Sequence, residues 1–163
     1  PWAIPGTPGL EHRIGGLEKQ HLSGNVNYEP QNHEFMVKLR AEKIERIANE
    51  IPPAEVEGDK KGDLLVVGWG STYGAIKTAV ARHRQKGNSV SQLHLKYLNP
   101  MPKNVGEILY NFKHVLVPEL NLGQLIKVLR AKYLVPAIGL NKVQGLPFMA
   151  TEIEKKIDEM LKG

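Results

Sequence analysis

The chain has 163 residues, of which 41% are hydrophobic and 24% charged, with a formal net charge of +5. This composition is typical of a folded globular domain, and the small positive charge permits acidic partners without requiring them. The absence of cysteine excludes disulfides, thiolate metal ligands, iron–sulfur ligation and cysteine nucleophiles from this chain. No apolar run reaches the ~20 residues that a membrane-spanning helix needs, so we expect no membrane partner.

The first third of the sequence predicts a connector rather than a compact domain. It starts Pro1-Trp2-Ala3, without an initiator Met or a signal-peptide pattern, as expected of a piece of a longer polypeptide. Prolines and glycines are too frequent in residues 1–31 for regular structure, which favours either a functional loop or a linker. Apolar residues at three- and four-residue steps predict a helix over 33–50, with Asn32 as its N-cap, and charges with prolines predict a solvated linker over 52–62.

Beyond the linker the pattern changes to alternating strands and helices. Strands are predicted over 64–67, 90–95, 114–117 and 135–140, and helices over 75–84, 105–110, 122–133 and 149–161. This alternation predicts an α/β fold: a three-layer, doubly wound, mainly parallel sheet with helices on both faces. We therefore divide the chain into a connector, residues 1–61, and an α/β domain, residues 62–163. The periodicity of the helix over 122–133 places Leu122 inward.

The first strand-to-helix turn of the α/β domain reads Gly68-Trp69-Gly70-Ser71-Thr72. Its glycines allow a tight turn, and the hydroxyls of Ser71 and Thr72 can cap the helix that follows. The N–H groups of the helix start can also hold an anion. The G-x-G-x-x-x-G spacing is one residue off the dinucleotide fingerprint, and Trp69 stands where a nucleophile elbow needs glycine. Two interpretations stay open, a structural turn with a cap or a contact with a small anion or partner.

A second group of polar residues follows the third predicted strand, and consists of Glu119, Asn121, Gly123 and Gln124. Polar side chains at the carboxyl end of a strand in such a fold are common in binding and catalytic sites. Gly123 permits close approach of another backbone. The alternative is that Asn121 caps the next helix and Glu119 is an ordinary loop carboxylate.

The histidines and the basic residues carry no specific site in the sequence. The six histidines lack metal-binding spacing, so His33 is interpreted as a helix-start residue, His94 as a strand-surface residue, and no metal site is predicted. Lysines and arginines are interleaved with acids or gathered at a helix end, without aromatic residues on the same face. We therefore expect no nucleic-acid partner.

Three segments of the α/β domain, at their observed separations, resemble a known family. They are 68–72 (Gly-Trp-Gly-Ser-Thr), 98–102 (Leu-Asn-Pro-Met-Pro) and 117–125 (Val-Pro-Glu-Leu-Asn-Leu-Gly-Gln-Leu). The sequence resembles the carboxy-terminal part of the alpha subunit of 2-oxoacid:ferredoxin oxidoreductases, and most closely the 2-oxoglutarate branch. The segment 117–125 is the most specific of the three.

The connector shares the resemblance. It is similar to the family's segment between the pyrimidine-binding domain and the last domain in Gly6-Thr7, Gly15-Gly16-Leu17-Glu18, His33 and the stretch 38–43. Lys19 departs from the family pattern, which commonly has histidine after the glutamate. The resemblance therefore extends over nearly the whole chain.

The resemblance implies a cytoplasmic, thiamine-diphosphate-dependent enzyme that oxidatively decarboxylates a 2-oxoacid with coenzyme A and passes electrons through iron–sulfur clusters to ferredoxin. It implies a transketolase carboxy-terminal-like domain that is mainly architectural and helps to join the alpha subunit to a beta subunit in a hetero-oligomer. Thiamine diphosphate, magnesium and clusters are then expected elsewhere in the complex, with no cofactor and no catalytic residue on this chain, which we expect to be inactive alone.

The resemblance implies that Glu119, Asn121, Gly123 and Gln124 form a subunit interface or fix the loop. It also implies that the turn at 68–72 lies at the same carboxyl edge of the sheet. The alternative from a different class is an anion- or nucleotide-binding α/β module without catalysis, using the glycine turn.

Overall fold

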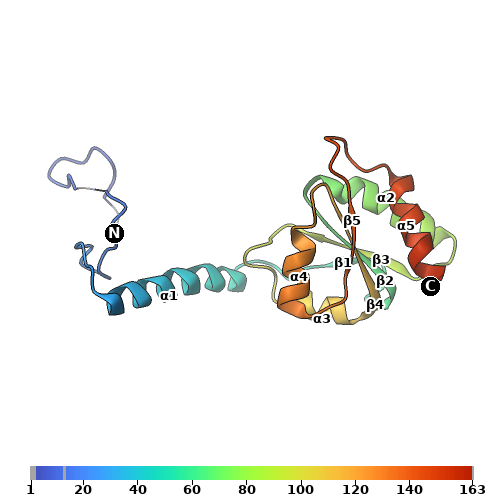
Figure 1. Ribbon diagram of the computed structural model, residues 1–163, viewed down its shortest axis with the longest axis horizontal. Helices are drawn as coiled ribbons and strands as arrows, with labels where there is room; N and C mark the ends of the chain where they lie inside the picture. Colours follow the sequence, from blue (N-terminus) through green and yellow to red (C-terminus); the bar gives the residue numbers. More distant parts are fainter. Residues whose placement is uncertain (1–2, 13, 163) are drawn as a thin grey trace. The chain divides into compact units, whose positions relative to one another are not determined.

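The computed structural model describes residues 3–12 and 14–162 (Figure 1). The chain divides into two compact units, Pro1–Arg46 and Ile47–Gly163, whereas the sequence analysis divided it after residue 61. Among the described residues, no helix combines the length and the apolar character needed to cross a bilayer.

The second unit is built on a five-stranded sheet with the order β1-β3-β2-β4-β5. The strands are β1 (Val56–Glu57), β2 (Gly62–Trp69), β3 (Val90–Leu95), β4 (Phe112–Glu119) and β5 (Ile138–Asn141). All neighbouring strands are parallel except the edge pair β1 and β3, which is antiparallel. In this order the connection after β2 runs to one side of the sheet and the connection after β4 runs to the other, so the topological switch lies between β2 and β4. Ligands commonly bind at the switch in such sheets.

Helices cover both faces of this sheet (Figure 1). They are α2 (Tyr73–Gln85), α3 (Val105–Tyr110), α4 (Leu125–Tyr133) and α5 (Ala150–Lys162), with a short 3-10 turn, η2 (Gly70–Thr72), before α2. Leu64 and Val66 of β2 share a core cluster with α2 and α5, whereas Leu65 and Val67 share one with α3 and α4. Alternate residues of a fully buried strand thus fill two separate cores. The predicted three-layer, mainly parallel α/β fold is confirmed.

β1 lies inside the stretch that the sequence analysis assigned to a solvated linker. Val56 and Glu57 pair with Leu93 and Gln92 of β3. The residue two before β1 is also held by Asn104, whose side chain accepts a hydrogen bond from Ala54 N at 2.9 Å and donates one to Ala54 O at 2.8 Å. The linker assignment was wrong at these residues because a two-residue strand is stabilised by tertiary contacts rather than by a local pattern.

The starts of α4 and β5 differ from the prediction. α4 begins at Leu125 rather than Leu122, and Leu122 is 80% exposed instead of inward. β5 begins at Ile138 rather than at residue 135, although Val135 is buried in the core before the strand starts. Apolar burial and strand hydrogen bonding therefore do not coincide along this segment.

The first unit consists of a loop and the helix α1 (Pro30–Arg46). α1 starts at Pro30, a residue suited to the first helical turn, whereas the sequence analysis started it at His33. Asn32 does not cap the helix: its side-chain amide donates to Lys19 O at 3.2 Å and ties the loop to the first turn. No described residue of 3–46 is buried. A short 3-10 helix, η1 (Ile47–Asn49), opens the second unit.

Candidate functional site

The predicted group after β4 is organised around the carboxylate of Glu119. Glu119 is fully buried, and its Oε1 accepts a hydrogen bond from Leu125 N at 2.8 Å while its Oε2 accepts one from Ile126 N at 3.1 Å. These are the first two N–H groups of α4, which have no partner inside the helix and carry the positive end of its dipole. A buried carboxylate is costly unless it is paired or hydrogen-bonded. Glu119 therefore acts as the cap that fixes where α4 begins.

Asn121 fixes the turn between Glu119 and α4. Its Oδ1 accepts hydrogen bonds from Gly123 N at 2.8 Å and Gln124 N at 2.9 Å, and its Nδ2 donates to Glu119 Oε1 at 3.2 Å. Gly123 adopts φ +82°, and a Cβ there would lie 3.0 Å from Ile126 Cγ2. The turn therefore needs both the Asn side chain and a glycine. Gln124 takes part through its backbone, and the residue is exposed.

A second loop, which follows β5, is joined to this turn. Asn141 Nδ2 donates to Asn121 O at 2.8 Å, and Lys142 N donates to Glu119 O at 3.0 Å. Lys142 Nζ is in turn held by Glu152 and Pro147 O, at distances of 2.9 to 3.0 Å. Sequence reasoning missed Asn141 and Lys142, because only the pairing of β4 with β5 brings them beside Glu119.

The indole of Trp69 links the two predicted groups across the topological switch. Trp69 Nε1 donates to Glu119 Oε1 over 3.4 Å, so the last residues of β2 and β4 are in direct contact. Thr72 is buried and bonds back to Trp69, donating its hydroxyl to Trp69 O at 2.9 Å and accepting from Trp69 N at 3.2 Å. It stands at the N-cap position of α2 without a side-chain bond to that helix, and it takes part instead in a capping box with Trp69 at the start of η2.

The glycines of this turn differ in their surroundings. A Cβ on Gly68 would meet Ile76 Cδ1 at 2.3 Å and Thr72 Oγ1 at 2.7 Å, so this glycine lets α2 pack closely on β2. Gly70 has φ +56° and open space around it, and Ser71 is exposed. These contacts favour the structural interpretation of the turn over the anion site.

A polar cluster that sequence reasoning missed lies beside a cavity of about 670 Å³ at the end of β3. Tyr73 donates its hydroxyl to Glu57 at 3.0 Å, accepts from Lys77 at 3.0 Å, and packs edge-on against the ring of His94. Burial lowers the pKa of His94, and the charge of Lys96 lowers it further. Burial alone raises the pKa of Glu57, but hydrogen bonding with its neighbours outweighs it and the net shift is downward.

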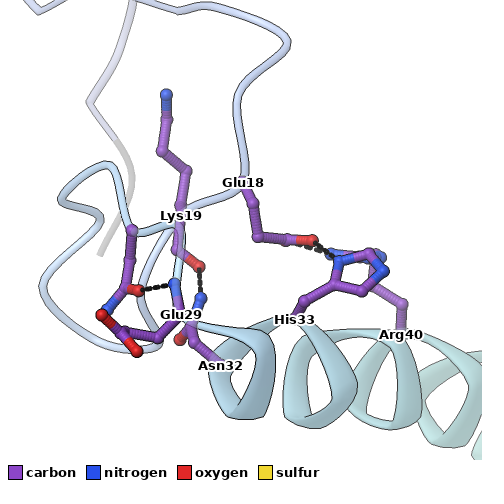
Figure 2. A network of polar contacts seen from close by, with 7 residues as sticks. Glu18, Lys19, Glu29, Asn32, His33 and Arg40 are labelled. Carbon is purple, nitrogen blue, oxygen red and sulfur yellow. Dashed lines mark hydrogen bonds and ion pairs between the residues drawn. The ribbon is translucent and has the colours of Figure 1, made fainter.

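In the first unit, Glu18 joins the loop to α1 (Figure 2). Its two carboxylate oxygens bond to Arg40 at 2.9 Å and to His33 Nδ1 at 2.7 Å, whereas the Lys19 side chain points away from α1. Arg40, and then His33, lower the pKa of Glu18 from 4.5 to about 2. His33 is thus an exposed helix residue with a carboxylate partner. A hollow of about 330 Å³ lies between residues 15–19 and α1.

The side chains do not converge into a metal centre in the part of the chain that the structure describes. Among residues 3–12 and 14–162, no three His, Asp or Glu side chains are grouped to hold an ion. The thiolate ligands that usually hold an iron–sulfur cluster are also missing, because the chain contains no cysteine.

The mainly parallel α/β fold of the second unit also occurs in known proteins. A solved split-gene transketolase, an inactive beta4 tetramer, shares this fold with a TM-score of 0.53 over 69% of this chain and 42% of its own, at 17% identity. Residues 62–145 match the family described as pyruvate:ferredoxin oxidoreductase core domain II. The chain belongs to this family, within the alpha subunits of 2-oxoacid:ferredoxin oxidoreductases.

Two individual relatives support the assignment at higher identity. The 2-oxoglutarate oxidoreductase subunit KorA of Mycobacterium tuberculosis is 53% identical over 164 residues, which cover 99% of this chain and 25% of that protein. The solved 2-oxoglutarate:ferredoxin oxidoreductase of Magnetococcus marinus, with 2-oxoglutarate, coenzyme A and succinyl-CoA bound, is 35% identical with a TM-score of 0.88, over 99% of this chain and 28% of its own. The chain thus spans about a quarter of these relatives.

Proposed function

We propose that this chain is part of the alpha subunit of a cytoplasmic, thiamine-diphosphate-dependent 2-oxoglutarate:ferredoxin oxidoreductase. The enzyme converts 2-oxoglutarate and coenzyme A into succinyl-CoA and carbon dioxide, and reduces ferredoxin. The observation that carries the proposal is the 53% identity to the KorA subunit of M. tuberculosis over 99% of this chain. The Magnetococcus marinus structure supports the same substrate and coenzyme.

Within this enzyme, the chain contributes architecture rather than chemistry. We place the diphosphate, magnesium and clusters in other parts of the complex; among residues 3–12 and 14–162, no three His, Asp or Glu side chains are grouped to hold an ion. When bound there, thiamine diphosphate supplies the carbanion stabilisation that decarboxylation needs. Glu119, Asn121 and Gly123 hold a loop at the sheet edge, and Gln124 stands exposed beside it for contact with a beta subunit.

The test is a reconstitution of the whole enzyme. The full-length alpha polypeptide that contains this chain is produced with its beta subunit, and reduction of methyl viologen is followed with coenzyme A and either 2-oxoglutarate or pyruvate. We expect reduction with 2-oxoglutarate, much slower reduction with pyruvate, and none from either subunit alone. Equal or faster reduction with pyruvate would contradict the substrate, and activity of the 163-residue chain alone would contradict the architectural role.

A further inference from the structure

The cavity at the end of β3 is formed by three separate parts of the second unit. Its walls come from residues of the segment 52–57, from Tyr73 at the start of α2, and from residues 94–97 and Pro102 at and after the end of β3. With about 670 Å³, it has the size of pockets that hold small organic molecules. It also lies at the carboxyl end of a parallel strand, which is the edge where α/β folds present side chains to ligands.

His94 lines this cavity and has one ring nitrogen without a partner. Nδ1 is buried and forms no hydrogen bond with any residue that the structure describes, whereas Nε2 is not closed off in this way. A proton on Nδ1 would leave a buried N–H without an acceptor, so the proton of the neutral ring belongs on Nε2. The imidazole therefore offers a hydrogen-bond donor to the cavity, and a ligand that accepts a hydrogen bond would satisfy it.

The charge that acts most strongly on His94 is the ammonium group of Lys96, which also lines the cavity. Lys96 lowers the pKa of His94 more than Glu57 raises it, so the field at the imidazole is positive. The charge of Glu57 is offset because its carboxylate is held by Tyr73 and Lys77. Lys96 is exposed and forms no ion pair with any residue that the structure describes. His94 and Lys96 thus provide two donors in a positive field, which favours an anionic group.

The rest of the wall is mainly apolar. It includes three prolines, Pro52, Pro53 and Pro102, and the ring of Tyr97, which is 44% exposed. The remaining carboxylate of the wall, Glu55, is exposed. A bare anion such as phosphate would leave the apolar surface uncovered, whereas a carboxylate attached to an apolar body would cover it.

We propose that this cavity binds an organic monocarboxylate with an apolar or aromatic body. The carboxylate accepts hydrogen bonds from His94 Nε2 and Lys96 Nζ, and the body covers the prolines and Tyr97. Such charge-assisted hydrogen bonds are stronger than neutral ones. The site needs neither thiamine diphosphate nor a second subunit, so its failure would leave the proposed function intact, and the reverse also holds.

The experiment uses 3-phenylpropionate as the probe and the full-length alpha polypeptide that contains this chain. The rate at which diethyl pyrocarbonate modifies His94 is measured by peptide mass spectrometry at a pH of about 8, where imidazole is neutral. We expect 3-phenylpropionate to protect His94, with half-protection at roughly 1–10 mM for a ligand of this size. His114, an exposed residue of β4, is the internal control and is expected to react at an unchanged rate.

Two analogues and one substitution separate the parts of the recognition. 3-Phenylpropanamide lacks the charge and acetate lacks the apolar body, so each is expected to protect His94 at least about tenfold less well. Lys96→Met removes the ammonium group and is expected to raise the half-protecting concentration of 3-phenylpropionate at least about fivefold. The matched control is Lys127→Met, which changes an exposed lysine of α4, and protection is expected within about twofold of the unmodified protein.

Equal protection by 3-phenylpropanamide, or unchanged protection in Lys96→Met, would overturn the proposal, because no carboxylate would then meet Lys96. Equal protection by acetate would mean a site for any small anion and would overturn the proposed ligand class. Slower modification of His114 in parallel with His94 would show an effect that does not arise in the cavity. A His94 that does not react without ligand would show that the cavity is closed to small molecules, which also overturns the proposal.

Discussion

Trp69 Nε1 donates to Glu119 Oε1 across the switch between β2 and β4, and this contact lies where doubly wound domains commonly bind ligands. Here the indole and the buried carboxylate occupy the switch themselves. The same carboxylate caps α4 through Leu125 N and Ile126 N. The side chains at the switch of this domain are thus hydrogen-bonded to each other and to the start of α4.

Removing the charge of Glu119 is expected to destabilise the domain. Glu119→Gln keeps the size of the side chain but replaces one of its two acceptor oxygens with an NH2 group. That NH2 group cannot accept a hydrogen bond from the backbone N–H of Leu125 or Ile126, so we expect the free energy of unfolding to fall by about 2 kcal/mol. Urea unfolding followed by circular dichroism measures this. The control is Glu55→Gln, an exposed carboxylate whose replacement is expected to change stability by less than about 0.5 kcal/mol. Equal effects of the two replacements would show that Glu119 does not fix α4.

Glycines on either side of η2 are expected to respond in opposite directions. Gly68→Ala forces a Cβ to within 2.3 Å of Ile76 Cδ1, so the close packing of α2 on β2 must yield, at about 1–3 kcal/mol of stability. Gly74 lies in the first turn of α2 with nothing within 4 Å of a Cβ, and Gly74→Ala is expected to stabilise by about 0.4–1 kcal/mol. The melting temperatures of the two variants measure these opposite changes in stability. A higher melting temperature for Gly68→Ala would contradict the close packing of α2 on β2.

The sequence predicted correctly the elements whose position depends on the hydrophobic pattern of their own residues. The strand over Val90–Leu95 and the helix over Val105–Tyr110 occur at the residues predicted for them. A strand buried on both faces has a continuous apolar run, and a helix buried on one side has apolar residues at three- and four-residue steps, so both can be recognised in a sequence. β1 was missed because its pairing with β3 and the Asn104 clamp are tertiary. The start of α4 was misplaced because the cap comes from Glu119, six residues before the N–H group that it accepts.

The same distinction holds for the candidate site. Glu119, Asn121 and Gly123 were recognisable because they follow one another at the end of a strand. Trp69 is 50 residues from Glu119 in the sequence, and nothing in its spacing indicates where the indole points. Tyr73 and His94 likewise meet only because α2 packs beside β3.

Asn104 is expected to determine whether β1 stays on the sheet. Asn104→Ala removes both hydrogen bonds to the Ala54 backbone, so we expect a loss of about 1–2 kcal/mol and faster amide exchange of Val56. Hydrogen–deuterium exchange measures the local effect. Asn111→Ala changes an exposed side chain and serves as the control, with unchanged exchange at Val56. Protection of Val56 that survives Asn104→Ala would mean that pairing with Leu93 alone holds the strand.

The attachment of the first-unit loop to α1 is expected to depend on pH through Glu18. Its pKa is lowered to about 2 by Arg40 and His33, so the folded contact favours the ionised carboxylate. A group with a lowered pKa stabilises the folded form above its ordinary value of 4.5, and this contribution is lost as the pH falls from about 4.5 to about 2. Carbon-detected NMR of the Glu18 carboxyl in this chain is expected to give a midpoint near 2.

Arg40 is the largest cause of the lowered pKa of Glu18 and His33 is the second, so replacing each residue in turn tests the origin of the shift. Arg40→Ala is expected to raise the midpoint of Glu18 toward its ordinary value, and to loosen residues 15–19 from α1 already at neutral pH. His33→Ala is expected to raise it less, because His33 is the second cause. A midpoint that does not move in Arg40→Ala would show that the contact drawn in Figure 2 does not set the ionisation of Glu18.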